Sequence, residues 1–401
     1  MKNFFRDIHL YLSLAAGLVI LIACITGAIL VFEKDMQMAF NKERYFVDPG
    51  TNPLSAGEMS AKVQEAYPDA KVNGIKLYKN TSRSAEVSIS ISEKKQKAAA
   101  GLENKISAAT SKRAPGYTVF VNPYSGAVLD KYTYSETFFY QVFALHRWLL
   151  GGSDSIGKYI VGIATLIFLF IILTGIILWW PRTKKILKQR LKIKTNVGWK
   201  RVNHDLHLVL GFYSAIFLFV FAFTGLAWSF KWFNDGIYKV TSSPLKSPPP
   251  PESKMVTNAQ AISFADALSA ARSVYPDAVS YAVSKPKDTA AAFSVVCLPE
   301  NAVHESATDV VYVDQYSGMV AGQTRFGDRS LGARVRSTFK PVHTGSIWGM
   351  PSKVLAFIVC LFGASFPITG TLMWINRTRK KNRNRNSAVR NKMKKQIVAS
   401  E

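Results

Sequence analysis

Four uncharged, apolar stretches constrain the fold of this chain more than any other feature of its sequence. They lie at about residues 10–32, 159–180, 206–230 and 354–375. Each exceeds the roughly 20 residues that a helix needs to cross a hydrocarbon core of about 30 Å. A chain of soluble domains would distribute its apolar residues more evenly. The sequence therefore predicts an integral membrane protein with four transmembrane helices.

The positions of the basic residues predict how these helices are oriented. The chain has 51 Lys and Arg against 26 Asp and Glu, a net charge of +25 that in a soluble protein would suggest nucleic acid as a partner. Here 2 of the bases lie in residues 1–9, 9 in 181–202 and 10 in 376–395, with a single acid, Asp7, in these segments. Cytoplasmic flanks of membrane helices are rich in Lys and Arg. We therefore expect cytoplasmic termini, two long loops outside, and no nucleic-acid partner.

Recurring motifs predict that the chain contains two tandem copies of one unit. Two of the spans begin near a His (His9, His207) and carry Thr-Gly 17 residues after it. The other two follow a His (His146, His343) and carry Thr-Gly, then Trp, then Arg-Thr. Both long loops contain Tyr-Pro-Asp-Ala and a later Tyr-Ser-Gly. The predicted fold is thus an α-helical membrane protein in which a span, an outer α+β domain and a second span occur twice.

The duplication divides the chain into eight predicted parts. They are the first span at 1–33, the first outer domain at 34–137, an interfacial segment and second span at 138–181, a basic cytoplasmic loop at 182–203, the third span at 204–231, the second outer domain at 232–338, an interfacial segment and fourth span at 339–376, and a basic cytoplasmic tail at 377–401.

Each outer domain is predicted to begin with a helix and to end with a strand hairpin. The helices are expected at Ser55 to Ala66 and at Ser263 to Val274, and Tyr-Ser-Gly supplies the hairpin turn. Residues 93–113, rich in Lys, Ala and Ser, are expected to form an exposed insertion between strands. Residues 380–401 are basic and polar all round, so we expect a disordered tail held near anionic lipid.

Five of the six histidines fall at predicted membrane edges, which suggests a cofactor site. His9 and His207 each lie 23 residues before the outer end of a span, so at 1.5 Å per residue both are about 34 Å from the outer surface. His146 and His343 are paired in the same way at the opposite face. A single histidine at a helix end is ordinarily an interfacial or capping residue. The equal depth within each pair favours a functional role.

Paired imidazoles on different helices can approach one metal from opposite sides, and haem uses such ligands inside a membrane. The sequence therefore predicts two haems, one held by His9 and His207 and one by His146 and His343. Zinc is a weaker candidate, since a structural zinc site would normally have four ligands with Cys among them. The Thr-Gly pairs are best explained by close helix packing. The alternative is that they leave room for a flat macrocycle.

Several residues beside the pairs are candidates for contacts with haem propionates. His204 lies one turn before His207, so it could replace His207 as the ligand or donate a hydrogen bond to a propionate. Arg6 and Arg201 lie near the first pair and Arg147 lies beside His146. Each arginine could equally be an interfacial base whose stem lies along apolar surface. No Gly-rich loop that could bind a dinucleotide occurs on the cytoplasmic side.

The ordered set of motifs resembles the PepSY-associated transmembrane family, which includes inner-membrane reductases of ferric siderophores. The likeness covers roughly residues 1–380, although Ser13 stands in the first span where Gly211 stands in the third. It implies a multi-pass protein of the bacterial inner membrane with periplasmic PepSY-like domains and two b-type haems. It also implies that His9, His146, His207 and His343 are the iron ligands, with no side chain acting as a catalytic acid, base or nucleophile.

The sequence is consistent with two functions. The first is a haem-dependent oxidoreductase that passes electrons to a periplasmic ferric siderophore or other Fe(III) chelate and releases Fe(II). Its electron donor would be a quinol or a flavoprotein in the membrane or cytoplasm. The alternative is a non-enzymatic membrane module whose outer domains bind or regulate a periplasmic partner, with histidines that are only structural. Haem content distinguishes the two.

Overall fold

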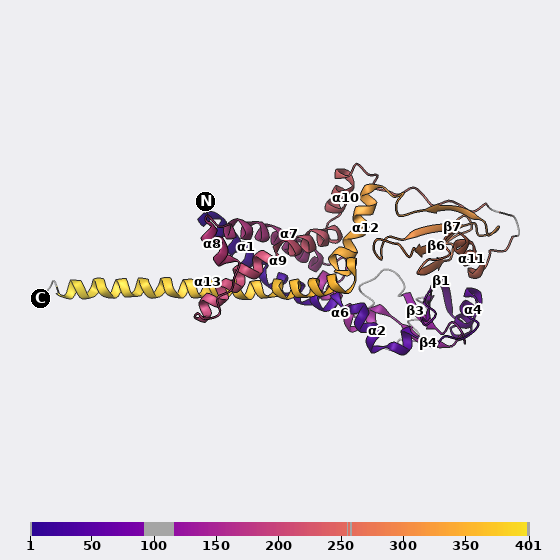
Figure 1. The fold of residues 1–401 in the computed structure, drawn as a ribbon, viewed down its shortest axis with the longest axis horizontal. Helices are drawn as coiled ribbons and strands as arrows, with labels where there is room; N and C mark the ends of the chain where they lie inside the picture. The colour runs from indigo at the N-terminus through magenta and orange to yellow at the C-terminus, as the bar shows by residue number, and fades with distance from the viewer. Residues whose placement is uncertain (1, 92–115, 255, 257–258, 399–401) are drawn as a thin grey trace.

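The computed structural model describes residues 2–91, 116–254, 256 and 259–398. Four long helices form a bundle at one end of the molecule, and a sheet domain lies at the other (Figure 1). The bundle helices are α1 (Lys2–Val31), α7 (Ile156–Trp179), α9 (Trp199–Ser229) and α13 (Met350–Val398). All four are long and apolar enough to cross a membrane, which confirms the predicted number of spans. The insertion expected at 93–113 lies outside the described residues.

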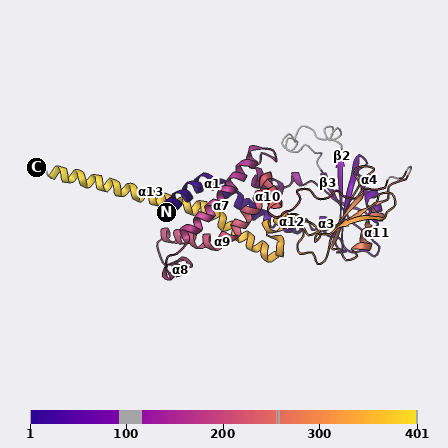
Figure 2. The ribbon, with the colours of Figure 1, turned by 90° about the horizontal axis from the view of Figure 1, so that it is seen from above.

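The four long helices are arranged as a ring. Helix α1 packs against α7 and α13, and α9 packs against the same two helices, so α1 and α9 lie diagonally opposite. Helix α13 continues beyond the bundle to Val398 (Figures 1 and 2). The expectation of a disordered tail was therefore wrong. The segment after Gly370 contains neither Pro nor Gly and is rich in Lys and Arg, which favour helix.

Short helices connect the bundle to the sheet domain, and one more lies at the opposite end of the bundle. In the first half of the chain they are α2 (Glu33–Phe40), α3 (Lys42–Tyr45), η1 (Tyr134–Glu136) and α6 (Phe138–Trp148). The loop between α7 and α9 contains α8 (Lys184–Arg190). In the second half they are α10 (Lys231–Val240), α12 (Leu331–His343) and η2 (Ser346–Trp348). Helices α6 and α12 contain His146 and His343, so both histidines lie on short helices outside the four spans.

The outer segments together form one antiparallel sheet of eight strands in the order β4-β3-β2-β1-β5-β6-β7-β8. The first segment supplies β1 (Ala70–Tyr78), β2 (Ala85–Ile91), β3 (Gly116–Val121) and β4 (Val128–Tyr132). The second supplies β5 (Ser280–Ser284), β6 (Phe293–Leu298), β7 (Asp309–Val313) and β8 (Val320–Thr324). Strands β1 and β5 pair in the middle, with Ile75 opposite Val283. This shared sheet was not anticipated from the sequence.

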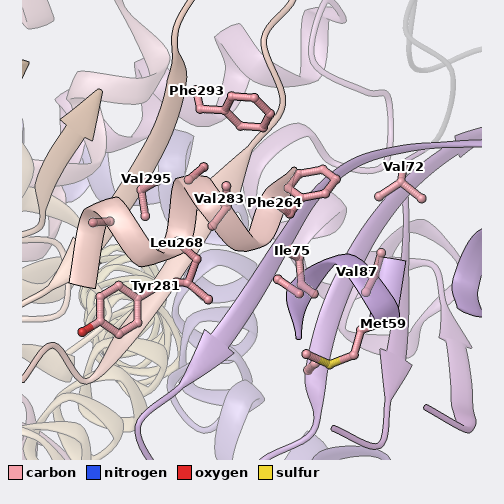
Figure 3. Packing of buried hydrophobic residues seen from close by; sticks show 14 of the residues in the cluster. Met59, Val72, Ile75, Val87, Phe264, Leu268, Tyr281, Val283, Phe293 and Val295 are labelled. Carbon is pink, nitrogen blue, oxygen red and sulfur yellow. The ribbon is translucent and has the colours of Figure 1, made fainter. Parts of the chain in front are cut away.

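One face of the sheet is covered by α4 (Ala56–Ala66) and α11 (Phe264–Val274), on the side away from the bundle (Figure 1). Both helices begin with the predicted Ser in a capping box, Ser55 with Glu58 and Ser263 with Asp266. Such boxes satisfy backbone N–H groups that would otherwise have no partner. The two predicted helices are therefore confirmed, and each begins at the expected serine. Side chains from the two helices and both halves of the sheet share a single core, part of which is shown in Figure 3.

The Tyr-Ser-Gly motifs form the predicted hairpin turns between β3 and β4 and between β7 and β8. Gly126 and Gly318 adopt φ angles of 73° and 70°, in the left-handed region that glycine enters without steric cost. The hairpins end in the outermost strands, β4 and β8. The chain then runs from β4 through η1 to α6, and from β8 to α12. The two edges of the sheet thus lead to the helices that contain His146 and His343.

Candidate functional site

Each of the four paired histidines contacts a Thr-Gly pair on a neighbouring helix through its Nδ1 atom. The Nδ1 to Thr Oγ1 distances are 3.0 Å for His9 and Thr174, 2.9 Å for His146 and Thr26, 2.7 Å for His207 and Thr369, and 3.1 Å for His343 and Thr224. The same local contact therefore occurs four times. We call each Thr-Gly pair with its imidazole a histidine seat.

The threonine fixes the protonation of each ring. Each seat threonine donates its own hydroxyl hydrogen to a backbone carbonyl one turn earlier in its helix, at 2.6 to 2.9 Å. Its oxygen can then only accept, so the imidazole Nδ1 must carry the hydrogen. Two of the rings are also within hydrogen-bond distance of a carbonyl, His9 of Ile171 and His343 of Phe221. Across the described residues, Nε2 of these four rings makes no hydrogen bond. The four unprotonated nitrogens are therefore available to a metal.

The glycine of each seat makes room for the ring. A Cβ atom added at Gly175 or Gly225 would lie 3.2 Å from Cε1 of the facing imidazole, and one added at Gly27 or Gly370 would lie 3.4 Å from it. These separations are at or below ordinary carbon contact distance. The Thr-Gly pairs therefore position histidines, a role that the sequence analysis did not consider. The signal was present, since each of the four spans carries one such pair.

His9 and His207, the cavity pair, line the same cavity between all four long helices. The cavity has a volume of about 640 Å³, within the range of about 300 to 1,000 Å³ that small-molecule and cofactor sites occupy. Most of its wall is apolar, and it includes Gly17 and Gly211 in addition to the seat glycines. This cavity lies at the end of the bundle away from the sheet domain. The structure thus brings together two residues that the sequence placed at equal depth.

Basic and polar groups line the same cavity and could contact the acidic groups of a cofactor. The predicted residues Arg6 and His204 are among them, as are three bases that the sequence analysis assigned only to topology: Arg190, Lys200 and Arg377. The indole Nε1 of Trp179, which also lines the cavity, is buried and has no hydrogen-bond partner in the described structure. A buried donor of this kind needs an acceptor. The cavity therefore suits a ligand with an apolar body and acidic ends.

Arg201 and His204 both approach the carboxylate of Asp205. Arg201 forms an ion pair with Asp205 at 2.9 Å and does not line the cavity. His204 approaches the same carboxylate with Nδ1 at 3.3 Å, and its side chain is 45% exposed. It therefore has no histidine seat, whereas His207 has one. This geometry favours His207 over His204 as the partner of His9.

His146 and His343, the sheet-side pair, face each other with ring centroids 6.2 Å apart. Two metal–nitrogen bonds of about 2 Å each would account for most of this separation, and the ring radii for the remainder. Burial lowers the pKa of both imidazoles to about 4, so they are neutral at pH 7. Arg147 lies beside them and donates from Nη2 to the carbonyl of Trp228 at 3.1 Å. The Trp228 ring is 5.4 Å from that of His343.

The chemistry of the donor set limits the metal centres that this chain could hold. Within residues 2–91, 116–254, 256 and 259–398, no group of three or more His, Cys, Asp or Glu side chains is placed to share a metal ion. The candidate donor sets are therefore pairs of neutral imidazoles with one free nitrogen each. Two such imidazoles would suit haem iron, whose remaining ligands come from the macrocycle and not from the protein.

The chain thus combines a four-helix membrane bundle, one histidine pair at each end of this bundle, and an antiparallel sheet domain outside it. The family described as PepSY-associated TM region matches residues 6–377, so the chain belongs to this family. The family resemblance drawn from the sequence is confirmed. A search of curated proteins finds no match to the chain.

Proposed function

We propose that this protein is a di-haem membrane oxidoreductase that passes electrons along its bundle to an Fe(III) chelate on the sheet side and releases Fe(II). The observation that carries the proposal is the set of four histidine seats. Each seat leaves Nε2 free, and the four rings form two pairs at different ends of the bundle. A structural role would not require four imidazoles with the same protonation and the same unused nitrogen.

The residues of each site have defined tasks. The seat threonines hold the imidazoles and fix their tautomer, as outer-shell partners of metal-binding histidines do. The apolar walls exclude water, and Arg6, Arg190 and Arg377 can balance propionate charge. Bound haem iron would supply one-electron redox chemistry, which no side chain of these sites provides. A haem held by two histidines would suit electron transfer and not oxygen binding.

The proposed orientation follows from charge. With the basic segments in the cytoplasm of a bacterium, the cavity pair lies near the inner face of the inner membrane and the sheet domain lies in the periplasm. The donor, a quinol or flavoprotein, is oxidised near the cavity pair, and the ferric ion is reduced by one electron on the sheet side. Fe(II) is a softer ion than Fe(III), so oxygen ligands such as those of a siderophore hold it less tightly.

Haem stoichiometry tests the proposal directly. A pyridine haemochrome assay of detergent-purified protein should give about two haems per chain, with a low-spin spectrum. His304→Ala is a matched control, because His304 lies in the sheet domain outside both pairs, and it should retain both haems. Protein that folds in the membrane with no haem would contradict the oxidoreductase proposal and leave the non-enzymatic alternative.

A further inference from the structure

A second cavity, which we call the basic cavity, lies in the first half of the sheet domain and has a volume of about 200 Å³. Three basic side chains line it, Lys34, Lys76 and Arg83, together with one acidic side chain, Glu86. Lys76 and Glu86 are opposite each other on β1 and β2. Their neighbours Ile75 and Val87 are buried in the core beneath α4. Because side chains alternate along a strand, the basic cavity lies on the other face of the sheet, toward the bundle.

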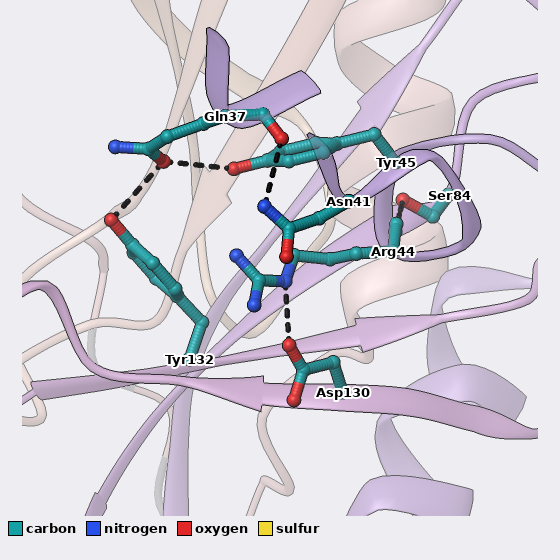
Figure 4. Close-up of polar contacts among 7 residues, drawn as sticks. All are labelled: Gln37, Asn41, Arg44, Tyr45, Ser84, Asp130 and Tyr132. Atoms are coloured by element: carbon teal, nitrogen blue, oxygen red, sulfur yellow. Dashed lines mark hydrogen bonds and ion pairs between the residues drawn. The ribbon is translucent and has the colours of Figure 1, made fainter. Parts of the chain in front are cut away.

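Polar contacts hold the wall of this cavity in place (Figure 4). The side-chain oxygen of Gln37 on α2 accepts hydrogen bonds from Tyr45 and Tyr132, at 3.1 and 3.2 Å. The guanidinium group of Arg44 on α3 binds Asp130 of β4 at 2.5 Å. These contacts attach α2 and α3 to the sheet and orient two of the aromatic rings that line the cavity. The cavity is therefore a built feature between fixed elements.

The positive charge in the basic cavity is not balanced. Glu86 accepts a hydrogen bond from the hydroxyl of Tyr78 and lies 3.6 Å from Arg83. Lys34 and Lys76 form no ion pair with any described residue, so the cavity carries an excess of two positive charges. Burial lowers the pKa of Lys76 below its usual value; the charges of Glu86 and Glu305 oppose this shift, and those of Lys34 and Arg83 add to it. An anion in the cavity would relieve this unfavourable burial of charge.

Arg83 provides a second indication of a missing ligand. Its guanidinium carbon lies 4.2 Å from the centroid of the Tyr78 ring, and its side chain is 13% exposed. The Nε atom is buried and has no hydrogen-bond partner in the part of the chain that the structure describes. Buried donors are normally paired, and an arginine fork matches the two oxygens of a carboxylate or phosphate.

The second half of the sheet shows that the fold itself does not require these charges. There the core pair Val283 and Val295 matches Ile75 and Val87, and the next pair, Ser284 and Ser294, takes the place of Lys76 and Glu86. The same strand arrangement is thus built with uncharged residues. The charges of Lys76 and Glu86 are therefore not needed to form this part of the sheet.

We propose that the basic cavity binds an acidic oxygen group, a carboxylate or a phosphate, of a soluble small molecule. A volume of about 200 Å³ is below that of typical sites for a whole ligand, so the cavity takes one acidic arm, with the rest of the molecule outside. That this molecule is an iron chelate rests on the proposed function. In that case the substrate class is the anionic carboxylate chelates, such as ferric citrate, and not neutral hydroxamate chelates.

Binding to the full-length protein tests the proposal without any requirement for haem. In nanodiscs of uncharged lipid, isothermal titration calorimetry should detect ferric citrate and iron-free citrate, and a neutral ferric trihydroxamate should bind at least tenfold more weakly. Lys76→Gln and Lys34→Gln should each weaken citrate binding about tenfold, and Lys76→Arg should retain it. Lys287→Gln, which removes an exposed lysine from the second half, is the matched control and should bind like the native protein.

Three outcomes would overturn the proposal. One is equal citrate binding by the native protein and the Lys34→Gln variant, which changes an exposed residue of the cavity lining. Another is equal binding of citrate and the neutral chelate. The third is occupancy that depends on phosphatidylglycerol in the nanodisc and not on citrate, which would assign the cavity to a lipid headgroup. Absence of haem would contradict the proposed function and leave the anion site intact.

Discussion

The two histidine pairs use the same seat but are carried by different parts of the molecule. His9 and His207 are on α1 and α9, two of the spans, and the bundle around them encloses the larger cavity. His146 and His343 are on α6 and α12, short helices that follow the edge strands of the sheet. The histidine seat is therefore a local module. It needs only Thr and Gly on one helix and a histidine on any helix packed against it.

The two histidine pairs also depend on different parts of the protein for their positions. The cavity pair is held entirely by the bundle, so its geometry depends on the packing of the four long helices. The sheet-side pair depends in addition on where the sheet places α6 and α12. Events in the sheet domain, including ligand binding, are therefore expected to affect the sheet-side pair and to leave the cavity pair unchanged.

Replacement of one histidine from each pair should have the largest effect. We expect His343→Ala and His9→Ala each to lower the haem content from about two to about one per chain, since one axial ligand is lost in each case. His343→Ala should also abolish reduction of an external ferric chelate, and His9→Ala should stop electron entry from the donor side. Haem stoichiometry, visible spectra and chelate reduction in vesicles measure these effects. His204→Ala is the control and should keep both haems. Full haem content in His343→Ala would disprove the ligand assignment.

A larger side chain at a seat glycine should have the second-largest effect on haem binding. Gly175→Val and Gly225→Val place branched carbons where a Cβ alone would already lie 3.2 Å from the imidazole of His9 or His343. Displacement of the ring should lower the affinity of the protein for the haem that this histidine binds. The expected decrease is about 10- to 100-fold, the range seen when a residue that supports a metal ligand is lost. Haem-reconstitution titrations give the affinity. Gly236→Val is the comparison variant, since a Cβ there meets no atom within 4 Å. An equal loss in all three variants would mean that crowding of the ring is not the cause.

Removal of a seat hydroxyl should distinguish the two members of the cavity pair. The one hydrogen-bond partner of His207 among the described residues is Thr369, whereas His9 contacts both Thr174 and the carbonyl of Ile171. Thr369→Val leaves a buried N–H without an acceptor, at a cost of about 1 to 3 kcal/mol. Thr174→Val should cost less because the carbonyl remains. Redox titration and haem affinity of the two variants should show this order, and the reverse order would contradict the hydrogen-bond assignment.

The smallest effect is expected from the helix caps of the sheet domain. Ser55→Ala and Ser263→Ala each remove a capping box and should lower the stability of the sheet domain by about 1 kcal/mol. Denaturant unfolding followed by tyrosine fluorescence measures the change. Because the sheet positions only α6 and α12, any accompanying spectral change should be confined to the sheet-side haem. A change in the haem of the cavity pair would show that the two sites are not mechanically separate.

Local sequence patterns were sufficient for much of this structure. Continuous apolar runs identify spans because the bilayer sets their length. Ser55 and Ser263 mark helix starts, and Gly126 and Gly318 mark turns, because a cap or a positive φ angle is decided by a few adjacent residues. The pairing of His9 with His207 also followed from depth along parallel helices.

The remaining features depend on contacts between distant segments. Nothing near Ile75 indicates that its strand pairs with the strand of Val283, some 200 residues away, since a buried strand has the same pattern whichever neighbour it joins. Nor does the sequence show that α1 lies beside α7, so Thr174 could not be recognised as the partner of His9. Arg190 and Arg377 were read only as topological charges for the same reason.

The distribution of seats and pairs along the chain has a consequence for how the molecule is assembled. Every seat is formed within one half: Thr174 and Thr26 hold His9 and His146, and Thr369 and Thr224 hold His207 and His343. Every pair, in contrast, takes one ring from each half. The protein is therefore organised like a dimer joined into one polypeptide. A piece ending before α9 would orient its two imidazoles correctly and still contain only one ring of each pair, so both pairs are complete only when the halves meet.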